Sequence, residues 1–180
     1  MYGYQNIPET NARVELRRGK ISRDERIRDR MAEYLANNGF YECTTYSFAG
    51  AADYAMLGIP VPDKTVRIMN PLGEDRAFMR QTLVPAMLRT VALNLNRGTR
   101  ELRLFETARA FMPSQDGQLP VERPVMCVAM AGEGADFGAI RSIIADMIYR
   151  GVRCDIQVRR AEVPWLSSTA SGEITVNGLK

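Results

Sequence analysis

The sequence predicts an α+β protein in which an antiparallel sheet is flanked by helices. Segments with the apolar spacing of helices alternate along the chain with segments rich in β-branched and aromatic residues. Several strand-like segments follow one another with no helix between them. Parallel strands need long crossover connections, so this order favours an antiparallel sheet over a doubly wound parallel one.

Composition sets the class of protein. The chain has 180 residues, 46% of them apolar and 25% charged, which is ordinary for a globular domain with one buried core. No apolar run approaches the ~20 residues needed to cross a bilayer, so we expect a cytoplasmic protein with no membrane partner. Three dispersed cysteines, Cys43, Cys127 and Cys154, predict reduced, mostly buried thiols and neither a disulfide framework nor a zinc site.

The chain contains no histidine. This excludes Ser-His-Asp and Cys-His nucleophile pairs, imidazole proton transfer and most zinc sites. Carboxylates could still act as acid or base, and arginine with Mg²⁺ could still act on phosphate groups.

The first predicted helix follows a tail. Residues 1–12 show no helical or strand period and are expected to be a linker, with the domain proper at 13–180. Ser22 and Glu25 have the spacing of a capping box, which begins the helix, and Gly39 is suited to end it. Its apolar residues share one face: Ile27, Met31, Tyr34 and Leu35.

Shorter elements are expected next. Residues 41–48 are aromatic and β-branched and predict a strand. Residues 49–57 predict a short helix ended by Gly58 and Pro60, and residues 66–69 a brief strand.

The segment 70–85 is the most distinctive in the chain. An Asn-Pro turn leads into a charged cluster and then into a helix, with Thr82 as the expected N-cap and Pro85 in the first turn. This helix carries an apolar stripe that runs from 83 to 95. Arg76 and Arg80 are therefore expected at the mouth of a rigid helix.

The sequence pattern in the second half of the chain predicts the remaining strands and one more helix. Strands are expected at 103–111 and 125–131, separated by a loop with Pro113, Gly117 and Pro120. Asp136 can cap a helix with apolar positions from Phe137 to Ile148. Residues 156–158 and 173–176 are expected to be closing strands.

An ordered series of motifs resembles the β chain of phenylalanyl-tRNA synthetases. The resemblance spans nearly the whole chain in the correct order, and this makes it specific. The matching blocks are YGYQNIP at 2–8, GFYECTTYSF at 39–48, NPLGEDRAFMRQTLVP at 70–85, NLNR at 94–97, LFE at 104–106, RAF at 109–111, DF at 136–137 and STASGEITVNG at 168–178.

The resemblance implies the fold of class II synthetase catalytic domains in a module that does not activate the amino acid. Phenylalanine and ATP would bind on the α chain of an α₂β₂ enzyme that uses ATP and Mg²⁺ and acts on tRNA. The family's Mg²⁺-associated carboxylates lie upstream of the signature at Tyr2. We therefore expect no catalytic residue, cofactor site or metal site in this chain, which would be one domain of a longer β chain.

Arg76, Arg80 and Glu106 allow two interpretations. They could form an ATP site, by analogy with the arginine that grips the α-phosphate in active class II enzymes, which would make the chain an adenylate-forming enzyme. Alternatively the arginines pair with Glu74, Asp75 or Glu106 and fix the entry to the helix. No glycine-rich arginine motif follows, and the second interpretation is preferred.

The stretch 13–30 is basic, with eight Lys or Arg against four acids. It could follow tRNA phosphates, or form a solvated helix face. A third interpretation is preferred, because the dimer-interface helix of class II folds also precedes a strand. In it, Ile27, Met31, Tyr34 and Leu35 pack on a partner subunit.

Overall fold

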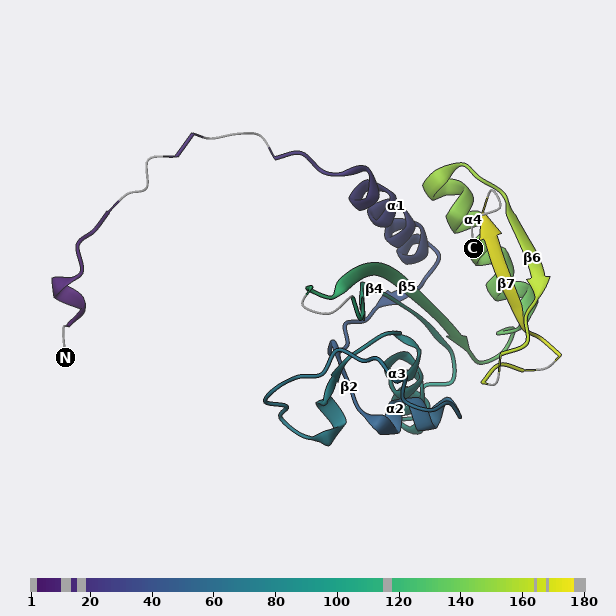
Figure 1. Cartoon of the computed structure of the whole chain (residues 1–180). Helices are drawn as coiled ribbons and strands as arrows, with labels where there is room; N and C mark the ends of the chain where they lie inside the picture. Colours follow the sequence, from purple (N-terminus) through teal and green to yellow (C-terminus); the bar gives the residue numbers. More distant parts are fainter. Residues whose placement is uncertain are drawn as a thin grey trace.

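The computed structural model describes residues 3–10, 14–15, 19–114, 118–163, 165–167 and 169–176. Its N-terminal segment, with a short 3₁₀ helix at Tyr4–Asn6, runs away from the body of the molecule (Figure 1). The body contains a central sheet with helices packed on both of its sides. No helix among these residues is long and apolar enough to span a bilayer.

Helix α1, Arg23–Asn37, forms as the sequence predicts. The Ser22 hydroxyl accepts the Glu25 N–H at 3.1 Å, and the Glu25 carboxylate accepts the Ser22 N–H at 2.8 Å. Both bonds satisfy donors that a helix start otherwise leaves unpaired. Gly39 follows the last turn with φ of 79°, the left-handed conformation in which glycine is favoured.

The central sheet has the strand order β1-β4-β5. The long strands β4, Leu102–Met112, and β5, Val121–Ala131, pair antiparallel over their whole length. The short β1, Tyr41–Glu42, pairs parallel with β4. The predicted α+β class is confirmed, with this one parallel pairing added.

The strand predicted at 41–48 is interrupted. After β1, the chain bends and re-enters a strand only at β2, Phe48–Ala49, which pairs with β3, Phe78–Met79. Between them the Thr45 N–H donates to the Glu106 carboxylate at 3.1 Å. A side-chain acceptor thus takes the place of a strand partner, which composition alone does not reveal.

Two helices and a 3₁₀ turn lie on the side of the sheet opposite α1 (Figure 1). They are α2, Ala51–Met56, a 3₁₀ turn at Glu74–Arg76, and α3, Val84–Asn96. The strand predicted at 66–69 is wrong in extent, because only a single bridge from Arg67 to Phe78 forms there. Thr82 is not the N-cap of α3: Leu83 holds that position, and the Thr82 hydroxyl accepts the Val84 N–H at 3.3 Å.

The last third of the chain forms α4, Phe137–Val152, followed by the antiparallel pair β6, Ile156–Arg160, and β7, Gly172–Val176. Asp136 caps α4 as predicted, accepting the Ala139 N–H at 2.7 Å. The β6–β7 pair is a separate two-stranded sheet.

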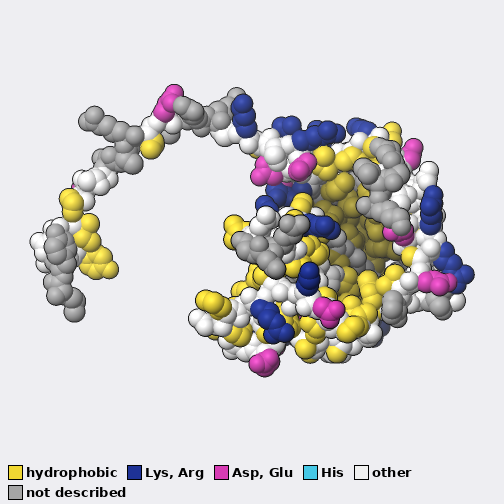
Figure 2. All heavy atoms as spheres, in the orientation of Figure 1, with side chains coloured by type: hydrophobic (Ala, Val, Ile, Leu, Met, Phe, Trp, Pro, Cys, Tyr) yellow, Lys and Arg dark blue, Asp and Glu magenta, His cyan; other side chains and the backbone are white. Residues whose placement is uncertain are grey.

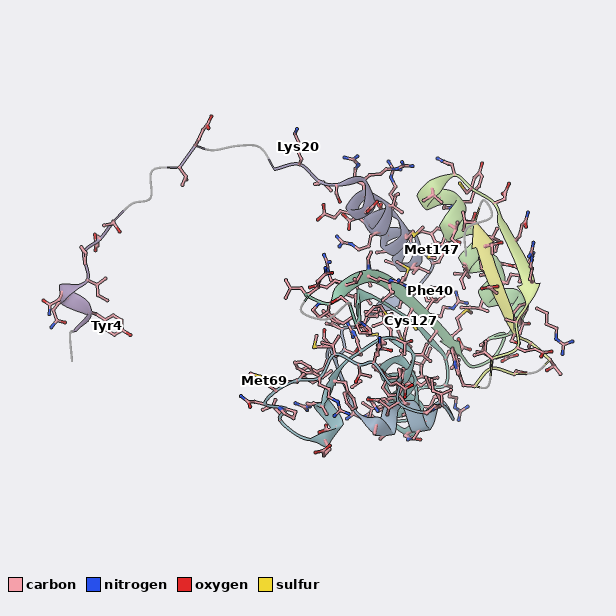
Figure 3. The ribbon with its side chains drawn as sticks, viewed as in Figure 1. Tyr4, Lys20, Phe40, Met69, Cys127 and Met147 are labelled. Carbon is pink, nitrogen blue, oxygen red and sulfur yellow. The ribbon has the colours of Figure 1, made fainter. Side chains whose placement is uncertain are left out.

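The main core lies where α1 and α4 cover one face of the sheet. Leu35, Phe40, Phe105 and Met147 are all buried there and pack together. Figure 3 shows Phe40 and Met147 side by side at this junction. The helices approach closely, since a Cβ on Gly151 would lie 2.7 Å from the Met31 methyl carbon.

Candidate functional site

Arg80 and Glu106 meet inside the domain. Arg80 directly follows β3, and Glu106 lies in β4. The Arg80 Nη1 is 3.0 Å from the Glu106 Oε1, and the two side chains are only 5% and 2% exposed. An ion pair this deep is stabilising only when further hydrogen bonds satisfy its remaining polar atoms.

Thr45 and two backbone carbonyls supply these further hydrogen bonds. The Thr45 hydroxyl lies 2.8 Å from the Glu106 Oε2 and accepts from the Arg80 Nη1 at 2.9 Å. The Arg80 Nε donates to the Arg109 carbonyl at 3.1 Å, and Nη1 also lies 3.2 Å from the Tyr46 carbonyl. The pair therefore joins β3, β4 and the bend after β1 into one unit.

Arg76 lies apart from this unit. Its side chain is 38% exposed, and its Nε is 3.5 Å from the Asp75 carboxylate. Its guanidinium lies over the Tyr46 ring, 5.0 Å from the centroid. The structure thus brings together Arg80 and Glu106, but it does not bring Arg76 into contact with either of them.

A hollow of about 490 Å³ opens beside Arg76, between α2, α3 and the bend after β1. Its charged groups pair with one another, Arg76 with Asp75 and Arg89 with Asp53. Asp53 also accepts the Gly50 N–H at 2.8 Å, at the start of α2. The sequence does not reveal the Asp53–Arg89 pair, although the spacing of Asp53 three residues after Gly50 indicates its capping role.

The predicted interface face of α1 divides into two parts. Leu35 is fully buried in the chain's own core, so it does not lie on a free surface as the interface hypothesis requires. Tyr34 packs against α4, with the Arg150 guanidinium 5.3 Å from its ring centroid. Tyr34 and Leu35 are covered because α4 packs antiparallel on α1. The periodicity of the sequence shows an apolar helix face, but it does not show whether the same chain or a partner covers that face.

Ile27 and Met31 lie closer to the β4–β5 hairpin, and Met31 also packs against Gly151 of α4. They line an open groove of about 470 Å³ between α1 and the β4–β5 hairpin. Pro124, Val125 and Met126 of β5 form much of the opposite wall. This groove is mainly apolar, with Asp24, Arg28 and Arg109 at its margin.

The three cysteines are half-buried free thiols. Burial raises the pKa of Cys127 to about 11, and the neighbouring Glu106 carboxylate acts in the same direction. Burial also raises the pKa of Cys43. Both thiols are therefore protonated and poorly nucleophilic at neutral pH.

Comparison with known sequences identifies the family. The sequence model described as "Phenylalanyl tRNA synthetase beta chain CLM domain" matches residues 7–180. The chain belongs to this family. This match confirms the resemblance to the β chain of phenylalanyl-tRNA synthetases that the sequence motifs indicate.

Curated relatives of this CLM domain are phenylalanine–tRNA ligase β subunits. That of Clostridium tetani is 30% identical over 182 residues, which cover 98% of this chain and 23% of the relative. That of Syntrophus aciditrophicus is 32% identical over 176 residues, covering 85% of this chain and 21% of the relative. The CLM domain thus spans less than a quarter of the length of these relatives.

Solved structures confirm the class II synthetase fold of the CLM domain. A pyrrolysyl-tRNA synthetase from Desulfitobacterium hafniense superposes with a TM-score of 0.57 at 15% identity, covering 76% of this chain and 48% of that one. An ATP phosphoribosyltransferase regulatory subunit/histidyl-tRNA synthetase from Bacillus halodurans gives a TM-score of 0.60 at 16% identity, covering 76% and 36%. At this identity the likeness concerns the fold alone.

Proposed function

We propose that the chain is a non-catalytic core module of the β subunit of phenylalanine–tRNA ligase. In this role it supports, through assembly of an α₂β₂ enzyme in the cytoplasm, the α subunit that joins phenylalanine to tRNA. ATP and Mg²⁺ are used on the α subunit, and this module itself holds no cofactor.

The state of Arg80 and Glu106 carries this proposal. In an ATP site the arginine must face an open cavity and be free to meet a phosphate. Here both side chains are almost fully buried, and each is the other's partner. A phosphate could reach Arg80 only by breaking an ion pair whose loss costs several kcal/mol, on the order of 3–5.

The groove beside α1 supports the role in assembly. Ile27 and Met31 line it, and Met31 also contacts Gly151 of α4, whereas Tyr34 and Leu35 are covered by the chain's own core. An open apolar groove that is flanked by charged groups is typical of a surface that another protein covers. We assign this groove to the α subunit and propose Ile27 and Met31, two of the four expected interface residues, as the ones that contact it.

Two kinds of measurement test the proposal, the first of ligand binding and catalysis and the second of assembly. Calorimetry of this chain with ATP and with phenylalanine should show no binding, and the chain alone should not catalyse ATP–pyrophosphate exchange. Exchange activity of this chain alone would instead establish the alternative, an adenylate-forming enzyme.

The second measurement addresses assembly. The α subunit from the same organism should be retained by this chain in a pull-down, and Ile27→Glu should weaken retention by about 10-fold or more, because it places a charge in an apolar contact. Leu93→Glu is the matched control, since Leu93 is 50% exposed on α3. Equal loss in both variants would contradict the assignment of the groove.

A further inference from the structure

A small cavity lies between α2, α3 and the segment that follows β3. It has about 10 Å³ of space for a water-sized sphere, and it borders the larger hollow between α2, α3 and the bend after β1. Its lining includes Asp53, Tyr54, Gln81, Ala86 and Arg89. A cavity of this size has room for one water molecule and for no larger ligand.

The Tyr54 hydroxyl is the main reason to place a ligand in this cavity. Tyr54 is only 3% exposed, and its Oη has no hydrogen-bond partner among the protein groups that the structure describes. A buried hydroxyl without a partner costs free energy, so native proteins satisfy nearly all such groups with protein atoms or ordered water.

The Tyr54 hydroxyl needs an acceptor for its proton. Burial and the Asp53 carboxylate raise the pKa of Tyr54, and the Gln81 backbone N–H acts in the opposite direction. An N–H group only donates, so Gln81 does not take the hydroxyl proton. The Asp53 carboxylate is an acceptor that lines the same cavity, but it forms no direct hydrogen bond with the Tyr54 hydroxyl.

Asp53 has capacity for a donor from the cavity. Its Oδ2 accepts the Gly50 N–H at 2.8 Å. Its Oδ1 lies against the Arg89 guanidinium in an ion pair, yet it accepts no well-formed hydrogen bond within the described part of the chain. A carboxylate oxygen accepts about two hydrogen bonds, so Oδ1 can take one from a group between it and Tyr54.

The charges around the cavity favour a neutral ligand. Asp53 is matched by Arg89, and Arg80, which also lines the cavity, is matched by Glu106. Figure 2 shows side chains of both charges on the surface where Figure 1 places β2 and α2. An ion in the cavity would therefore add an unmatched charge, whereas water supplies both a donor and an acceptor without one.

We propose that this cavity is the binding site of one structural water, which accepts the Tyr54 O–H and donates to the Asp53 Oδ1. Because Arg80 and Arg89 line the cavity as well, the water lies between the Arg80–Glu106 unit and the Asp53–Arg89 pair. It links α2 to α3 and to the segment after β3. This site does not depend on the function proposed for the chain.

A crystal structure of this chain that resolves ordered water tests the site directly. One density peak should lie about 2.5–3.0 Å from both Tyr54 Oη and Asp53 Oδ1. The proposal would be overturned by a cavity without such a peak, or by a Tyr54 hydroxyl that bonds directly to a protein acceptor.

A double-mutant cycle tests the bridge in solution. Tyr54→Phe removes the hydroxyl, and Ala86→Val adds methyl groups at the cavity wall that displace the water. In the unaltered chain, Tyr54→Phe removes a satisfied hydroxyl and should lower the urea midpoint of unfolding. In the Ala86→Val background the hydroxyl is buried without an acceptor, so Tyr54→Phe should raise the midpoint.

Ala92→Val is the matched control, because it makes the same substitution at an exposed position of α3 that does not line the cavity. In this background Tyr54→Phe should lower the urea midpoint as it does in the unaltered chain. A higher midpoint for Tyr54→Phe in the unaltered chain would show that the hydroxyl has no partner, and the proposal would fall. Equal losses in all three backgrounds would show that the hydroxyl bonds to a protein group, with the same consequence.

Discussion

Arg80 and Glu106 form a buried ion pair with 3.0 Å between Nη1 and Oε1, whereas Arg76, four residues before Arg80, forms an exposed contact of 3.5 Å with Asp75. The two arginines are equivalent in the sequence motif and very different in their surroundings. Burial, and not the motif, decides what each contributes to stability.

The two arginines should therefore respond differently to the same substitution. Arg80→Gln leaves the Glu106 carboxylate buried without its charge partner and should lower the free energy of unfolding by about 3–5 kcal/mol. Arg76→Gln removes only an exposed contact and should cost less than about 1 kcal/mol. Urea unfolding followed by circular dichroism measures both, and similar losses would contradict the structural role of Arg80.

Much of the fold could be predicted from the sequence because its signals are local. The capping box at Ser22, the cap at Asp136 and the paired strands at 103–111 and 125–131 depend on neighbouring residues, and each forms. The break after β1 could not be predicted, because it depends on Thr45 meeting Glu106, sixty-one residues away.

The candidate site was harder to predict for the same reason. An apolar helix face indicates that other residues pack on it, but it does not show whether those residues belong to the same chain or to a partner. Leu35 is covered by the chain's own core, whereas Ile27 and Met31 line an open groove. Part of the basic stretch, Arg13, Arg17 and Arg18, lies outside the described residues, so its proposed contact with tRNA stays a prediction.

The contact between α1 and α4 should be sensitive to added volume. A Cβ on Gly151 would lie 2.7 Å from Met31 Cε and 3.0 Å from Met31 Cγ, so Gly151→Ala forces the helices apart or Met31 aside. We expect a loss of roughly 1–3 kcal/mol in the free energy of unfolding. Adding Met31→Ala should relieve part of it, and a double-mutant cycle from urea unfolding measures the coupling. Strictly additive losses would contradict the contact.

Cys127 should resist modification in the folded protein. Burial raises the pKa of its thiol to about 11, so almost none is thiolate at pH 8. Iodoacetamide should leave Cys127 unmodified over a period in which it alkylates the cysteine completely in urea, as mass spectrometry of the digested protein would show. Rapid alkylation of Cys127 without denaturant would contradict its burial.

The capping box should make α1 sensitive to acid. Hydrogen bonds from the Ser22 N–H and hydroxyl hold the pKa of Glu25 below its ordinary value of 4.5. Because the pKa of Glu25 is lower in the folded state than in the unfolded state, its carboxylate stabilises the fold at pH values above the unfolded pKa. This contribution is lost as the pH falls through the folded pKa. Glu25→Gln should therefore cost stability at pH 7 and progressively less below about pH 4. Titration of the Glu25 carboxyl carbon by NMR checks the cause: Ser22→Ala removes the hydroxyl but keeps the backbone N–H, so it should raise the Glu25 pKa part of the way toward the ordinary value. Ser142→Ala, which removes a hydroxyl bonded to Gly138 in α4, should leave the Glu25 pKa unchanged. An unshifted Glu25 in the unaltered chain would show that the box does not persist in solution.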